Sequence, residues 1–177
     1  MKPLTLLKSR FGSLYILNII FLVVSFALRT ALCIRSAADA DFTLPLLTKI
    51  YAVGLLFDFV TCFYCSVPVF LYLLLIPEKT FNTKINRRFL TGLYLALLCI
   101  ILFDVFAEWL FWGEFNGRFN FVAIDYLTYP RQIVRNIIES YPVLPLFAAL
   151  FAVTAVLFLA TRKYYLLTFE SAGPFRQ

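Results

Sequence analysis

The chain of 177 residues has no histidine, and charged residues make up only 15% of it. Histidine is the commonest general base and metal ligand in enzymes. Its absence excludes a self-contained histidine-dependent hydrolase and a histidine-ligated zinc site, and we expect no metal or cofactor in this chain. The low charge, combined with 62% hydrophobic and 19% aromatic residues, lies far outside the range of soluble domains. The composition therefore predicts an integral membrane protein.

Cysteine is also sparse, with four residues that all lie in or beside apolar runs. This placement excludes the disulfide framework of a small secreted domain. Cys62 and Cys65 form a CxxC pair at helical spacing inside one such run. We interpret them as small packing residues rather than as a redox or metal site.

Long apolar runs are what the chain has in abundance. A helix needs about 20 apolar residues to cross a hydrocarbon core, and four runs reach that scale: residues 11–28, 50–76, 89–112 and 143–160. They are continuous rather than alternating, which favours helices over barrel strands. The sequence thus predicts an all-α membrane protein, a single transmembrane domain over residues 1–177. The second run exceeds the bilayer and should tilt, kink or protrude, with Pro68 as the expected kink.

The net charge of +6 is distributed unevenly between the loops. Ten basic residues fall on the side of the N-terminus and the 77–88 loop, and six on the other side. The positive-inside rule places the N-terminus in the cytoplasm and residues 113–142 outside. Because the basic residues stand at loop ends rather than on one face, we expect no nucleic-acid partner. Residues 38–40 fit a signal-peptide cleavage pattern, but the preceding run is too long, so a retained helix is predicted.

Three acidic residues lie inside predicted spans, where an unpaired charge costs at least about 2.5–3.5 kcal/mol. Asp58 and Asp104 are expected at similar depth, and Glu108 lies one turn from Asp104 on the same face. One acid must be protonated, or a cation such as Arg29 or Arg118 must come close. Two interpretations remain open: a polar cluster between the second and third spans that opens toward the outer headgroups, and a buried pairing that fixes helix packing.

The outer segment, residues 113–142, mixes aromatic and polar residues. From Pro130 its apolar residues share one helical face and its charged residues the other, which predicts an amphipathic helix lying in the membrane interface between the third and fourth spans. The candidate residues for contacting lipid headgroups or docking another domain are Arg118, Asn120, Asp125, Tyr126, Arg131, Arg135 and Glu139.

A pattern across this segment resembles a known family. It comprises Arg118-Phe119-Asn120-Phe121, Ala123, Asp125-Tyr126-Leu127, Tyr129, Asn136-Ile137 and Glu139-Ser140-Tyr141-Pro142. This pattern is similar to that of membrane-anchored phosphoglycerol and phosphoethanolamine transferases such as lipoteichoic acid synthase, in the alkaline phosphatase and sulfatase superfamily. The resemblance implies an extracytoplasmic catalytic domain with a divalent metal and a threonine nucleophile. No residue of this chain matches that catalytic site, so none is assigned a catalytic role.

The resemblance predicts a non-catalytic membrane-anchoring and orienting domain of such a transferase, acting in bacterial envelope or glycan modification. It would lie in the bacterial cytoplasmic membrane, with lipids and a missing or separately encoded catalytic domain as partners. Four spans return the C-terminus to the cytoplasm, so we expect a fragment, a split gene product or a truncated relative. The alternatives are a stand-alone membrane scaffold or regulatory protein, and a transporter subunit whose acidic residues line a polar path.

Overall fold

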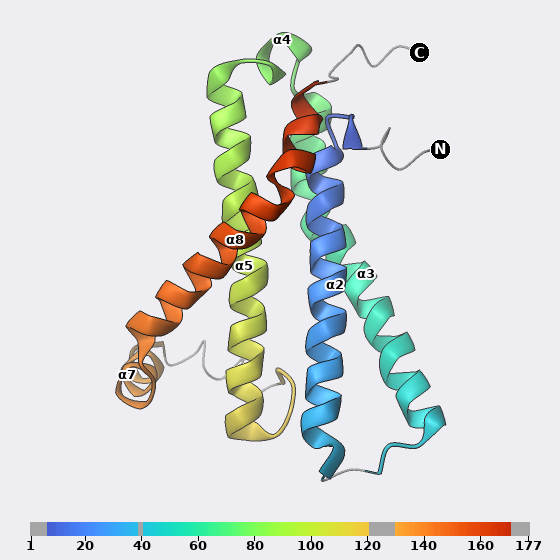
Figure 1. The fold of residues 1–177 in the computed structure, drawn as a ribbon, viewed down its shortest axis with the longest axis vertical. Helices are drawn as coiled ribbons and strands as arrows, with labels where there is room; N and C mark the ends of the chain where they lie inside the picture. The colour runs from blue at the N-terminus through green and yellow to red at the C-terminus, as the bar shows by residue number, and fades with distance from the viewer. Residues whose placement is uncertain (1–6, 39–40, 121–129, 171–177) are drawn as a thin grey trace.

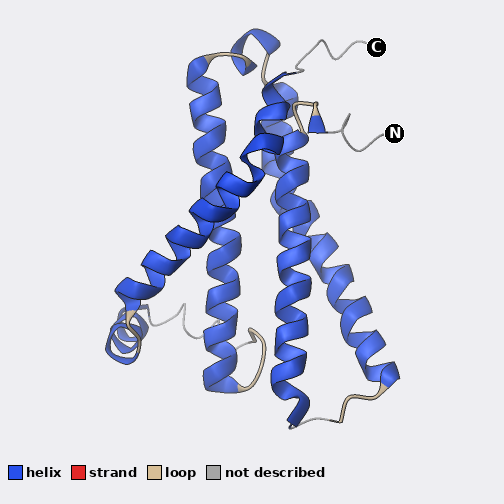
Figure 2. Cartoon of the chain, in the orientation of Figure 1, coloured by secondary structure: helices blue, strands red, loops and turns tan. Residues whose placement is uncertain are grey.

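A computed structural model describes residues 7–38, 41–120 and 130–170, and within these ranges the chain is helical without any strand (Figures 1 and 2). The helices, in chain order, are α2 (Gly12–Arg35), η1 (Ser36–Ala38), α3 (Leu44–Leu75), α4 (Glu78–Phe81), α5 (Lys84–Phe115), α7 (Pro130–Ser140) and α8 (Val143–Glu170). Of these, α2, α3, α5 and α8 are long and apolar enough to cross a membrane. The prediction of an all-α chain with four such helices is confirmed.

The helices extend beyond the apolar runs that predicted them. α2 continues to Arg35 instead of ending near residue 28, α3 begins at Leu44 instead of near residue 50, and α5 and α8 are longer in the same way. The helices thus continue past the predicted spans of 11–28, 50–76, 89–112 and 143–160, whose bounds within a membrane stay a prediction. The physical reason is that hydropathy falls at the first charge, whereas a charge with a partner, such as Arg29 beside Asp58, does not end a helix.

The over-long second span is accommodated without a break in its helix. α3 continues through Pro68. In Figure 1 it diverges from α2 toward the end of the bundle opposite the termini, which we call the distal end. There α5 ends at Phe115 and α7 begins. The helices are therefore close together near the termini and spread apart at the distal end.

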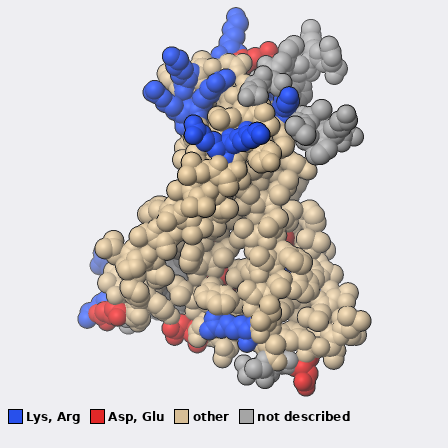
Figure 3. Space-filling model, in the orientation of Figure 1, with Lys and Arg blue, Asp and Glu red and all other residues tan. Residues whose placement is uncertain are grey.

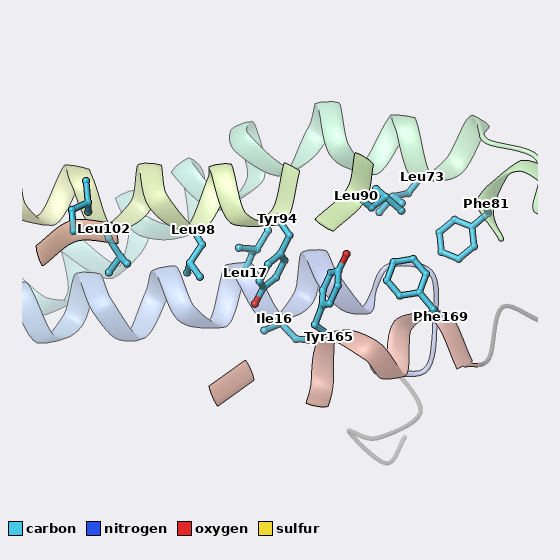
Figure 4. Close-up of a cluster of buried hydrophobic side chains, with 11 residues drawn as sticks. Ile16, Leu17, Leu73, Phe81, Leu90, Tyr94, Leu98, Leu102, Tyr165 and Phe169 are labelled. Atoms are coloured by element: carbon cyan, nitrogen blue, oxygen red, sulfur yellow. The ribbon is translucent and has the colours of Figure 1, made fainter. Parts of the chain in front are cut away.

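The centre of the bundle is α2, which packs against α3, α5 and α8, while α5 also packs against α8. A buried cluster fills the end near the termini, and Figure 4 shows its side chains converging from several helices. The rings of Tyr94 and Tyr165 lie 4.7 Å apart, and Phe169 stacks on Phe81 at 5.7 Å. Tyr165 shares a hydrogen bond with Thr91 at 2.9 Å, so its buried hydroxyl is satisfied.

A cation fastens the end of α3 to the residues before α2. Arg10 Nη1 donates to the carbonyl oxygens of Leu73 and Ile76, each at 3.2 Å. Its guanidinium also lies over the ring of Phe81 at 5.2 Å. The last carbonyls of a helix have no partner within the helix and carry partial negative charge, so a cation stabilises them. This contact helps to hold the compact end together.

Candidate functional site

The spread distal ends of α2, α3 and α5 border a half-open cavity of about 1320 Å³, which we call the interhelical cavity. The lower half of Figure 3 is hollowed between the helices, with acidic atoms visible inside. The polar residues that line the interhelical cavity are Ser25, Arg29, Arg35, Ser36, Lys49, Asp58, Thr61, Asp104, Glu108, Asn116 and Arg118. The structure thus brings all three acidic residues of the predicted intramembrane cluster to one cavity.

The deepest ion pair joins α2 to α3. Arg29 Nη2 lies 2.7 Å from Asp58 Oδ2, and Ser25 Oγ donates to Asp58 Oδ1 at 2.7 Å. Arg29 is 3% exposed and Asp58 is 7% exposed. A buried carboxylate of this kind is stable only when it is paired and hydrogen-bonded. Both of its oxygens have a partner here.

A glycine makes room for this pair. Gly54 lies one helical turn before Asp58, and the guanidinium of Arg29 packs directly over it. A side chain at position 54 would overlap the Cζ and Nε atoms of Arg29. Gly54 therefore leaves room for the Arg29 guanidinium in the position where it pairs with Asp58.

A second ion pair closes the distal rim of the interhelical cavity. Arg118 donates from Nε and Nη2 to the two carboxylate oxygens of Glu108, the latter bond at 3.0 Å. Glu108 is 4% exposed, whereas the side chain of Arg118 is half-exposed. The hydrogen bond to Glu108 raises the pKa of Arg118 above its usual value. A bidentate pair fixes orientation as well as charge, so residues 116–120 are held against α5.

The lining of the interhelical cavity has three further charged residues, Asp104, Arg35 and Lys49. Asp104 is exposed toward the cavity, and none of the three ion pairs among the described residues involves it. The guanidinium of Arg35 lies over the ring of Trp109 at 5.0 Å, a cation–π contact. With Lys49, the lining holds four cationic and three acidic side chains, a formal excess of one positive charge.

The polar cluster was expected between the second and third spans, with a cation such as Arg29 or Arg118 close to its acidic residues. Arg29 of α2 pairs with Asp58 and Arg118 pairs with Glu108, so the cluster also includes α2. Asp58 and Glu108 are buried in ion pairs, as the packing interpretation requires, and Asp104 is accessible from the cavity, as the cluster interpretation requires. Sequence reasoning did not assign Arg35 or Lys49 to the site. The spacing of Ser25, Arg29, Leu32 and Ser36 places these four on one helical face, but it marks neither Arg35 nor Lys49.

The other candidate residues lie away from the interhelical cavity. Arg131, Arg135 and Glu139 are exposed on α7, where Arg135 Nε lies 2.9 Å from Glu139 Oε1. Asn120 is exposed at the end of the described 116–120 segment. Asp125, Tyr126 and residues 39–40 of the candidate cleavage pattern lie outside the described residues.

The apolar face of α7 borders a second cavity, of about 780 Å³, between α5, α7 and α8. Val134, Ile137 and Ile138 contribute to its lining. The hydroxyl of Tyr141, directly after α7, donates to the carboxylate of Glu114 near the end of α5. Tyr141 thus connects the far end of α7 to the same helix end that Arg118 approaches from the other side.

Replacing Arg118 with Ala tests how firmly the rim is held. The carboxylate of Glu108 would remain buried without its bidentate partner, a loss of about 1–3 kcal/mol. We expect a lower midpoint of detergent unfolding and faster protease cleavage within residues 116–120. Arg131→Ala is the matched control, because that arginine is exposed on α7. Equal effects of the two substitutions would contradict the proposed importance of the Glu108 pair.

The described residues show no further chemical centre. Cys62 is buried, Cys65 is exposed, and both are free thiols. Within residues 7–38, 41–120 and 130–170, no three cysteine or acidic side chains lie close enough to share a metal ion. Comparison with known protein families, characterised proteins and solved structures gives no match to this chain.

Proposed function

We propose that this chain is the non-catalytic membrane-anchoring and orienting domain of an envelope transferase similar to lipoteichoic acid synthase, the family that residues 118–142 resemble. The observation that carries the proposal is that both ends of this segment are fixed to the last two turns of α5. Arg118 pairs with Glu108, and Tyr141 donates to Glu114. A loop that only reversed the chain would not need two such attachments. They would hold α7 as a platform at the distal end.

The platform would lie in the headgroup layer of the membrane. α7 carries the exposed apolar residues Val134, Ile137 and Ile138 beside the second cavity, and its exposed charged residues are Arg131, Arg135 and Glu139. An amphipathic helix of this kind buries its apolar face at the boundary of headgroups and acyl chains. Arg131 and Arg135 would then contact lipid phosphates or an acidic face of the catalytic domain.

The orientation follows from the distribution of charge. Figure 3 shows lysine and arginine side chains gathered at the end that carries the termini. By the positive-inside rule this end would face the cytoplasm of a bacterium, and the distal end would face outward. The catalytic domain, with its divalent metal and threonine nucleophile, would sit on the outer side, in a separate polypeptide or beyond a further span of the same one. This chain would position that domain without taking part in the chemistry.

Charge reversal on the platform tests the docking role. In the full-length transferase that carries this domain, Arg131→Glu with Arg135→Glu should lower the transfer rate about thirtyfold or more, since each of the two basic residues is worth about 1 kcal/mol near an anionic surface. Lys79→Glu, on α4 at the opposite end, is the control and should leave the rate unchanged. Transfer that is insensitive to the double substitution would overturn the docking role.

Two alternatives make different predictions. A stand-alone scaffold would use the same distal surface, but transfer would continue when the domain was deleted. A transporter subunit would need a polar path through the bundle, whereas the end near the termini is filled by buried side chains such as Leu73, Tyr94 and Leu98. Ion flux that depended on Asp58, Asp104 and Glu108 would favour the transporter.

A further inference from the structure

The second cavity, between α5, α7 and α8, is a half-open groove, which we call the lateral groove. In Figure 1, α8 slants away from α5 toward the distal end, where α7 lies beside the start of α8. The inner end of the lateral groove is closed by Leu150, a 4% exposed member of the buried cluster. Phe103 and Phe147, also in its lining, remain about half-exposed. The lateral groove is therefore closed against the core and open to the surroundings between the helices.

The polarity of the lateral groove changes along its length. Apolar side chains such as Phe106 and Leu146 make up most of its wall. Among its described lining residues, the polar ones are Glu114, Ser140 and Tyr141. Glu114 lies in the last turn of α5, Ser140 ends α7, and Tyr141 follows directly. An apolar interior with polar groups at the distal end matches the polarity of a lipid, a polar headgroup on an apolar chain.

The length of the lateral groove matches one leaflet of a membrane. Along α5 its lining runs from Phe103 to Phe115, which is about 18 Å at 1.5 Å per residue. One leaflet contributes about 15 Å of a hydrocarbon core of about 30 Å. Because α5 and α8 are long and apolar enough to cross the membrane, this length lies beside the lipid chains of the leaflet at the distal end. The volume of about 780 Å³ is within the roughly 300–1,000 Å³ typical of small-ligand sites.

Neither water nor an empty space suits such a groove. A buried water needs two to four polar partners, which an apolar wall does not supply. An empty space would cost the lining side chains their dispersion contacts. A lipid chain restores these contacts with α5, α7 and α8 at once.

The charge at the polar end selects the kind of lipid. The carboxylate of Glu114, which accepts a hydrogen bond from Tyr141, lies at the end where the head of the lipid would be. It would repel the carboxylate of a free fatty acid. The uncharged glycerol esters of a phospholipid meet no such repulsion, and the hydroxyl of Ser140 can donate to an ester oxygen.

We propose that the lateral groove holds one acyl chain of a phospholipid from the leaflet at the distal end, with the glycerol ester beside Ser140 and Tyr141. The inference goes beyond the anchoring role and needs only that α5 and α8 cross the membrane. The side chains of α7 that line the lateral groove are Val134, Ile137, Ile138 and Ser140. The charge-reversal experiment alters the arginines of α7 instead, so its failure would leave the lipid site unaffected.

Native mass spectrometry of the full chain tests the proposal. The protein is purified in detergent, incubated with dipalmitoyl phosphatidylcholine and freed of the micelle in the instrument. We expect retention of lipid to saturate at one molecule per chain. Dioctanoyl phosphatidylcholine should be retained less, because its chains fill only part of the groove, and palmitate should be retained less because of Glu114. Absence of saturable retention, or equal retention of either of these two probes, would overturn the proposal.

Ala107→Phe places a ring in the lateral groove, where Ala107 of α5 contributes to the wall. It should lower the affinity for dipalmitoyl phosphatidylcholine about tenfold or more, the scale of an overpacked contact. Ala152→Phe is the matched control, because that alanine is exposed on α8 outside the described lining, and it should bind as the unaltered chain does. Equal affinities of the two variants, both folded by their unfolding midpoints, would contradict the site. If Ala107→Phe does not fold, the comparison of chain lengths in the unaltered protein decides.

Discussion

Arg29→Met should lower the free energy of unfolding by about 3–5 kcal/mol, the cost of leaving a buried charge without its partner. Asp58 would keep only the hydrogen bond from Ser25 while remaining buried beneath α2. Adding Asp58→Leu to Arg29→Met should restore most of the stability, because replacing both members of a buried pair with apolar residues is often neutral or stabilising. The recovery is the decisive part of this result, since it separates an orphaned charge from a simple loss of packing.

The measurement is unfolding by denaturing detergent of the purified protein, analysed as a double-mutant cycle. Arg135 and Glu139 form the matched control pair, with side chains 79% and 61% exposed on α7. Removing an exposed pair at this helical spacing changes stability by about 0.3–0.5 kcal/mol. If Arg29→Met and Arg135→Met were equally mild, the pair between α2 and α3 would not have the structural role assigned to it.

Gly54→Ala should destabilise the protein, whereas Gly92→Ala should stabilise it. Both glycines lie inside helices, where alanine is intrinsically better by about 0.5–1 kcal/mol. At position 92 an added Cβ meets nothing within 4 Å, so this gain is realised in full. At position 54 the Cβ overlaps the guanidinium of Arg29. That buried group must then shift, and we expect the weakening of its pair with Asp58 to outweigh the helix gain.

Helix propensity favours alanine at both positions, so it cannot by itself make one substitution destabilising and the other stabilising. The two variants are compared in the same detergent by their unfolding midpoints. Stabilisation by Gly54→Ala would show that the guanidinium moves aside at little cost.

The length of apolar runs was sufficient to predict the four long helices, because crossing hydrocarbon requires a minimum number of apolar residues whatever the tertiary structure. Their ends could not be predicted in the same way. Arg29 and Arg35 look like a helix end in the sequence, but their partners Asp58 and Trp109 are distant in the chain. A charge is tolerated inside a span when a partner is present, and sequence spacing within one helix does not identify that partner.

The candidate site was predicted in part for a related reason. Asp58, Asp104 and Glu108 attracted attention because isolated acids are costly in a membrane, and all three line one cavity. The central position of α2 was not predictable, since four similar apolar helices can be arranged in several ways. Gly54 also carries no signal by itself, because its importance arises only when Arg29 of another helix lies against it.

The packing of α2 against α8 can form only late in translation, because the two helices are far apart in the sequence. Of the four long helices described, α2 is translated first and α8 last. Only after α8 has been translated can Tyr165 join the buried cluster and the carbonyl of Phe169 accept a hydrogen bond from Arg87. Until then, the side of α2 and α5 that packs against α8 has no helix covering it. A chain released before α8 would keep that side exposed, which would mark it as unfinished to the quality-control proteases of the membrane.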